Sequence, residues 1–67
     1  MRPAILRELR ISCGLSQADL AAAAEVPRWR ISLWEASGSL PPVDACRRIA
    51  AIFDRSVNSI FGPTVTM

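Results

Sequence analysis

The residue types that carry most catalytic and metal chemistry are scarce in this chain. Histidine is absent, which excludes imidazole metal ligands, Ser-His-Asp triads and Cys-His pairs. The two cysteines, Cys13 and Cys46, are too few to hold zinc by themselves. We expect them to be reduced thiols packed as small apolar residues, with a single disulfide as the alternative. The acidic residues, which form no evident pair for general acid–base catalysis, are Glu8, Asp19, Glu25, Glu35, Asp44 and Asp54. We therefore predict no enzyme, no metal site, no cofactor and no small-molecule substrate.

The basic residues of the chain point to a different chemistry. All eight are arginines, and the net charge is +2. A guanidinium group is a planar fork that donates paired hydrogen bonds to phosphate oxygens and to guanine edges. The mildly basic balance permits a nucleic-acid partner without requiring one.

The length of 67 residues fits one domain, which we place at residues 1–62, followed by a short tail at 63–67. Apolar residues make up 51% of the chain, and so small a domain leaves part of them exposed, which favours self-association. No apolar run approaches the roughly 20 residues of a membrane span. Charged residues at positions 7, 8 and 10 interrupt any signal-peptide core. We expect a cytoplasmic protein without a membrane partner.

Apolar residues recur at helical spacing, and stop signals divide the chain into five short helices. The expected fold is all-α, a compact bundle of five helices. The predicted helices cover residues 3–13, 17–24, 28–36, 42–53 and 57–61.

Individual residues give the ends and faces of these helices. Gly14 ends the first, Ser16 caps the second with Asp19 in an approximate capping box, and Pro27 starts the third. In the fourth helix we expect Arg47 and Arg48 to face outward. Its predicted buried stripe is Val43, Cys46, Ile49, Ala50 and Phe53.

Residues 16–35 contain a short helix, a three-residue turn and a second helix, which is the helix-turn-helix pattern. In this pattern the second helix presents one face to the DNA major groove and packs its other face into the domain. Ile31 and Trp34 are the expected inward residues. The expected presented face is Arg28, Trp29, Ser32 and Leu33.

The sequence resembles the Cro/repressor-type (XRE-like) helix-turn-helix DNA-binding domains from about residue 5 to residue 61. The matching segments, in order and without gaps, are LRELR (6–10), GLSQADLA (14–21), ISLWE (31–35), SLP (39–41), RIA (48–50) and VNSIF (57–61). This resemblance implies the same five-helix fold, with the helix-turn-helix at helices 2 and 3. It also implies binding to double-stranded DNA.

The resemblance implies roles residue by residue. Gln17 matches a residue that touches a phosphate, and Arg28 matches a base-reading position from which it can bridge guanine O6 and N7. Arg10 and Glu35 match a pair that often forms an internal salt bridge. The residues for which DNA contact is implied are Ser16, Gln17, Arg28, Trp29, Arg30, Ser32, Leu33, Ser37, Gly38 and Ser39.

Several of these residues keep an alternative interpretation. Arg28 can serve as a phosphate contact only, and Arg30 reaches either phosphate or solvent. Trp29 can pack on a thymine methyl or a sugar, or on another protein. The loop at 37–39 grips phosphate through backbone N–H groups, or it is a plain surface turn.

Two positions depart from the family pattern. Glu25 occupies the turn, where a glycine in the left-handed conformation is usual. A non-glycine residue in that conformation costs roughly 1 kcal/mol, and Glu25 also adds a negative charge near the DNA side. Pro27 replaces the usual Ser or Thr cap of the recognition helix, the helix expected at 28–36 that faces the groove.

The sequence thus predicts a sequence-specific transcriptional regulator, of the repressor type, that acts as a homodimer. Its candidate dimer surface is Ile60, Phe61, Val65 and Met67, although Ile60 and Phe61 can equally complete the core. The alternative is a protein-interaction module of the same fold, antitoxin-like or an adaptor. Its Trp29 and Leu33 face would dock a protein partner such as a toxin or a polymerase subunit.

Overall fold

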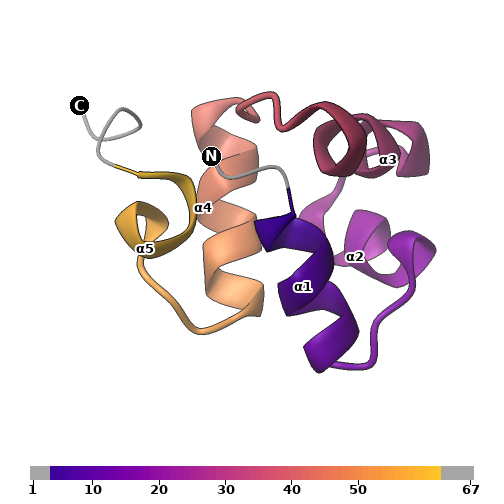
Figure 1. Ribbon diagram of the computed structural model, residues 1–67, viewed down its shortest axis with the longest axis horizontal. Coiled ribbons are helices and arrows are strands. Elements are labelled where there is room, and N and C mark those ends of the chain that lie inside the picture. The colour runs from indigo at the N-terminus through magenta and orange to yellow at the C-terminus, as the bar shows by residue number, and fades with distance from the viewer. Residues whose placement is uncertain (1–3, 63–67) are drawn as a thin grey trace.

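The computed structural model describes residues 4–62, which fold into five α-helices without a strand (Figure 1). The helices are α1 (Ile5–Ser12), α2 (Gln17–Ala24), α3 (Arg28–Ser37), α4 (Val43–Ile52) and α5 (Val57–Phe61). The predicted all-α class and helix order are confirmed, with helix ends that differ from the predicted ones by at most two residues. The predicted tail at 63–67 and the first residue of the predicted 3–13 helix lie outside the described residues.

Local capping explains where these helices begin and end. Ser16 accepts a hydrogen bond from the backbone N–H of Asp19, whose carboxylate accepts from the N–H of Ser16, which makes a complete capping box. Ser56 caps α5 through the N–H of Ser59. Gly14 follows α1 at φ +72°, a conformation that glycine adopts without steric cost.

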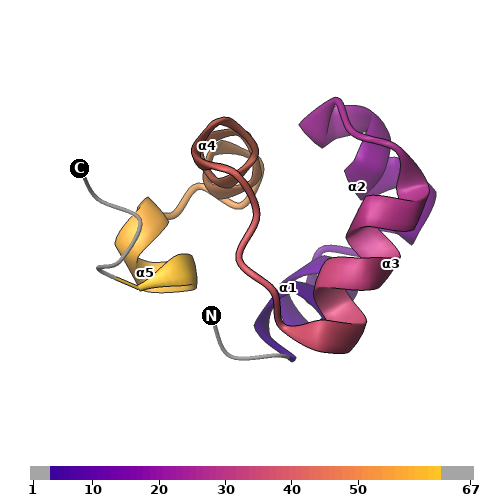
Figure 2. The same ribbon diagram turned by 90° about the horizontal axis from the view of Figure 1, so that it is seen from above.

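The core gathers side chains from all five helices, and α2 is central because it packs on both α3 and α4. α1 packs on α3, and α4 packs on α5. The largest fully buried side chains are Phe61, Leu6, Leu20, Ile31, Ile49 and Cys46. Seen from above, α3 lies at one edge of the molecule and α5 at the opposite edge, so one long face of α3 is uncovered (Figure 2).

Two expectations for α4 are wrong. Val43 is 43% exposed because it is the first residue of the helix, where no neighbouring element covers it. Ala45 is buried in its place. Arg48 does not face outward, because its Nε donates a 2.6 Å hydrogen bond to the carbonyl oxygen of Ala24 at the end of α2.

The apolar residues at the end of α5 are buried in the core. Ile60 is 5% exposed and Phe61 is 1% exposed, so they complete the core and do not form a dimer surface. Val65 and Met67, the other two members of that predicted surface, lie outside the described residues.

The two cysteines are both free thiols, so the disulfide alternative is wrong. Cys46 is buried as expected, and burial raises the pKa of its thiol. Cys13 is exposed, contrary to the expectation, because it follows the last residue of α1 at the surface. Within residues 4–62, none of the helices is long and apolar enough to cross a bilayer.

Candidate nucleic-acid interface

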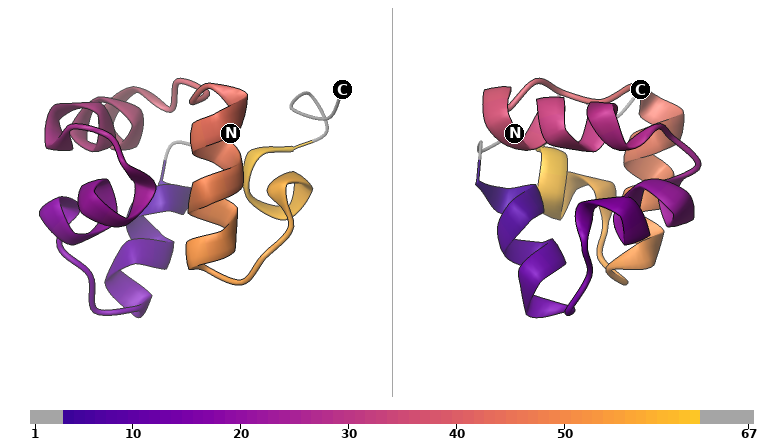
Figure 3. Two further views of the ribbon diagram at one scale, coloured as in Figure 1. Left: turned by 180° about the vertical axis from the view of Figure 1, so that it is seen from behind. Right: turned by 90° about the vertical axis from the view of Figure 1, so that its right-hand side faces the viewer.

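α2, the turn at residues 25–27 and α3 form a helix-turn-helix. The right-hand panel of Figure 3 shows α3 across the top of the molecule with α2 beneath it. Ile31 is fully buried and Trp34 is 5% exposed, so these two side chains fix α3 to the core. The exposed residues of the same helix include Arg28, Trp29, Arg30, Ser32 and Leu33. One side of α3 is therefore anchored and the other is free to enter a groove.

The outer face of α3 combines apolar area with positive charge. Trp29 is 61% exposed and Leu33 is 48% exposed, so both apolar side chains present much of their area to solvent. The guanidinium carbon of Arg30 lies 5.3 Å from the centre of the Trp29 ring, within the range of a cation–π contact. The expectation for Arg30, contact with phosphate or solvent, did not include this contact.

The turn between α2 and α3 has an unfavourable residue at its tightest point. Glu25 adopts the left-handed conformation, at φ +60° and ψ +42°, and its N–H donates to the carbonyl of Ala22. Arg48 supports the turn from α4, because its cationic side chain occupies the carbonyl end of α2, where positive charge is favourable. No local sequence signal predicts the Arg48 contact, since it joins residues on two different helices.

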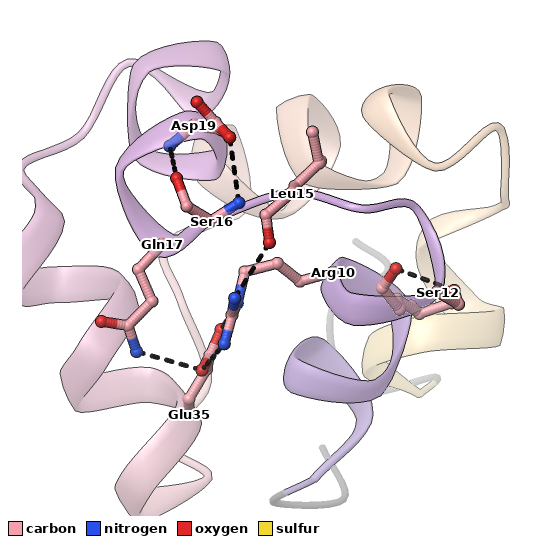
Figure 4. A network of polar contacts seen from close by, with 8 residues as sticks. Arg10, Ser12, Leu15, Ser16, Gln17, Asp19 and Glu35 are labelled. Atoms are coloured by element: carbon pink, nitrogen blue, oxygen red, sulfur yellow. Dashed lines mark hydrogen bonds and ion pairs between the residues drawn. The ribbon is translucent and has the colours of Figure 1, made fainter.

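Three side chains from three helices meet below the start of α2 (Figure 4). Arg10 Nε donates to Glu35 Oε2 at 2.7 Å, and Arg10 Nη2 donates to Glu35 Oε1 at 3.1 Å. Gln17 Nε2 donates to the same Oε1 at 3.1 Å. The side chains of Arg10 and Glu35 are only 12% and 6% exposed. The hydrogen bond to Glu35 raises the pKa of Arg10 above its usual value. Arg10 and Glu35 therefore form an internal ion pair, and Gln17 joins it.

The segment after the recognition helix differs from the predicted loop. Ser37 is the last residue of α3 and does not belong to the loop, because its main chain continues the helix to Gly38 at φ +71°. The N–H of Gly38 donates to the Trp34 carbonyl, and the N–H of Ser39 donates to Ser37 Oγ. These two N–H groups are already used within the protein. Ser37 Oγ, which carries one proton, lies 2.8 Å from the Leu33 carbonyl oxygen and 2.9 Å from Ser39 Oγ, so the Ser39 hydroxyl is also engaged within the protein.

A family model described as helix-turn-helix matches residues 6–60 of the chain. The chain belongs to the helix-turn-helix family. The match confirms the predicted Cro/repressor (XRE-like) type and makes the protein a DNA-binding regulator domain in general terms. No curated protein and no solved structure is significantly similar to the chain.

The helix-turn-helix domain contains a position at which its stability can be raised. Replacing Glu25 by glycine is expected to increase the free energy of unfolding by about 1 kcal/mol, because glycine adopts the left-handed conformation without the Cβ clash. The matched control is Glu25→Gln, which removes the charge and keeps the strained side chain. Chemical denaturation of both variants checks this, and equal stability of the two would contradict the strain explanation.

The capping box of α2 gives the helix-turn-helix domain a pH-dependent element. The Ser16 N–H and hydroxyl hold the pKa of Asp19 below its ordinary value of about 4. A carboxylate with a lowered pKa in the folded state contributes stability above its unfolded pKa, and this contribution is lost as the pH falls. Asp19→Asn is therefore expected to destabilise the protein at pH 7, with a difference from the wild type that shrinks below about pH 4. Denaturation curves over this pH range measure it, and a constant difference throughout would argue against this role.

Proposed function

We propose that this helix-turn-helix protein binds a specific duplex DNA sequence as a homodimer, with α3 in the major groove, and represses transcription by blocking the polymerase. The observation that carries the proposal is the division of α3 into two faces. Ile31 and Trp34 hold one face in the core, and the opposite face, with Arg28 and Leu33, is exposed. A rigidly anchored helix with a free face is what major-groove reading requires.

The exposed side chains suit defined DNA groups. Arg28 is in the first turn of α3, where its guanidinium can donate to guanine O6 and N7. Leu33 offers only apolar contact, which in the major groove means the methyl group of thymine, and Trp29 can pack on the same methyl group or on a sugar. Ser32 and Arg30 serve as polar contacts beside them. Phosphate contacts come from Gln17 at the start of α2, with the Ser39 hydroxyl after α3 as a second site that gives up its bond to Ser37.

Two features limit the phosphate contacts that the family resemblance implies. Ser16 commits its N–H to Asp19 and its hydroxyl oxygen accepts from the Asp19 N–H, so only the hydroxyl proton of Ser16 is left for a DNA contact. The Gly38 N–H is bonded to Trp34, and the N–H and hydroxyl of Ser39 are bonded to Ser37, so phosphate contacts after α3 compete with bonds inside the protein. One module therefore makes few contacts, and this favours a two-fold pair of modules on two half-sites.

Selection of bound sequences from a random duplex library tests the proposal directly. An enriched palindrome with half-site centres about 10 base pairs apart is the expected result. Arg28→Ala should relax the preference for guanine at one position of each half-site and lose about 1–3 kcal/mol of discrimination there. Absence of enrichment at low salt would contradict sequence-specific DNA binding. Repression, the lack of an enzymatic activity and a cytoplasmic location remain predictions.

Docking of another protein on the Trp29 and Leu33 face is the second candidate. The observation that favours it is the large exposed fraction of both side chains. The salt dependence of the affinity separates the two functions. If Z phosphates are neutralised, the logarithm of the binding constant falls with the logarithm of the salt concentration with a slope of about −0.9Z. The affinity of an apolar protein contact is nearly independent of salt.

A further inference from the structure

Gln17 is hydrogen-bonded to the Arg10–Glu35 ion pair through Glu35. It opens α2, and its half-buried side chain reaches α3, where Nε2 lies 3.1 Å from Glu35 Oε1. Figure 4 shows the amide nitrogen of Gln17 toward Glu35 and its oxygen facing away. Glu35 Oε1 also accepts from Arg10, and Glu35 Oε2 accepts from Arg10 Nε. The Glu35 carboxylate thus accepts three hydrogen bonds from side chains of two other helices.

This arrangement fixes which end of the amide faces the protein. A carboxylate paired with arginine accepts hydrogen bonds only, so the amide oxygen of Gln17 cannot take the place of Nε2 without repulsion. One hydrogen of Nε2 is committed to Glu35, and the other remains for an outside acceptor. Arg10 balances the charge of Glu35, so the ion pair has no net charge and does not repel a DNA phosphate near Gln17.

We propose that Glu35 is a positioning residue for DNA binding: it fixes the Gln17 amide in a single orientation, in which the second hydrogen of Nε2 is held ready for a phosphate. The inference rests on the proposed function, because it assigns a cause to the phosphate contact of Gln17. Glu35 acts through Gln17 and does not itself touch DNA. The hydrogen bond between Gln17 and Glu35 thereby links the start of α2 to α3 at the proposed phosphate contact.

The first test uses the protein without DNA. Gln17 and Asn58 are the only side-chain amides of the chain, so an ¹⁵N NMR spectrum contains two pairs of NH₂ signals, and exposed Asn58 is the internal control. The Gln17 pair is expected to be widely split and protected from hydrogen exchange relative to the Asn58 pair. A Gln17 pair that behaves like that of Asn58 would overturn the contact.

The second test measures coupling in DNA binding. The double variant Arg10→Met/Glu35→Met removes the tether without leaving an unpaired buried charge, which protects the fold. Gln17→Ala is expected to weaken binding to the selected duplex roughly tenfold in the wild-type background, as for a hydrogen bond to a charged group, and less than about twofold in the double variant. The double variant should also lose the split Gln17 signals.

The outcomes are distinguishable. Equal effects of Gln17→Ala in the two backgrounds would overturn the positioning role, even if the NMR signals show the contact. Failure of the wild type itself to bind any duplex would overturn the proposed function, and the NMR spectrum would still decide whether Glu35 holds Gln17.

Discussion

Ile31→Ala is expected to lower the free energy of unfolding by about 2–5 kcal/mol, the usual cost of deleting a fully buried aliphatic side chain. Ile31 is 0% exposed and is one of the side chains that α3 contributes to the core. A domain of 67 residues has a total stability of about 3–10 kcal/mol, so this one change removes a large part of it. Urea denaturation followed by circular dichroism measures the loss.

Leu33→Ala is the matched control, because it removes the same number of carbon atoms from the same helix. Leu33 is 48% exposed, so its stability effect is expected to stay within about 0.5 kcal/mol. Its effect should appear in DNA affinity, through the lost methyl contact. If both variants lose similar stability, the division of α3 into a buried and a free face is wrong.

Arg10→Met is expected to destabilise the protein by about 2–4 kcal/mol. The change leaves the Glu35 carboxylate, 6% exposed, without its ionic partner, and it removes the 3.0 Å hydrogen bond from Arg10 Nη1 to the carbonyl of Leu15. Breaking a fully buried pair costs about 3–5 kcal/mol, and an exposed pair contributes about 0–1 kcal/mol; this pair lies close to the buried case. Guanidinium denaturation with a fitted m-value checks the change.

The control for this prediction is again Arg10→Met/Glu35→Met. Replacing both charges by apolar side chains of similar size removes the unpaired charge, so the double variant should recover most of the stability lost by Arg10→Met. A double variant as unstable as the single one would mean that the Leu15 hydrogen bond, and not the ion pair, carries the effect.

The helices and their ends were predictable because they depend on neighbouring residues. The capping box of Ser16 and Asp19 is a signal within four positions, and Gly14 marks its turn in the same way. The ion pair of Arg10 and Glu35 was expected from the resemblance to a family. Periodicity alone does not provide it, because the two residues are 25 positions apart.

Apart from the Arg30–Trp29 contact within α3, the contacts that escaped prediction depend on packing between helices. Arg48 carries a charge on a predicted outward face, and only the approach of α4 to the end of α2 places its Nε beside the Ala24 carbonyl. Gln17 likewise finds Glu35 only when α2 and α3 pack together. Val43 fits the helical stripe of α4, but periodicity does not show where the covering elements end.

The two tryptophans of the chain lie on opposite faces of α3, one buried at 5% exposure and one at 61%. Each indole therefore reports a different event by its intrinsic fluorescence. Trp34 shifts its emission when the core opens to water, whereas Trp29 responds when a ligand covers the outer face. With the other indole replaced by phenylalanine, each variant follows either folding or binding without an added dye, on the same helix and in the same solution.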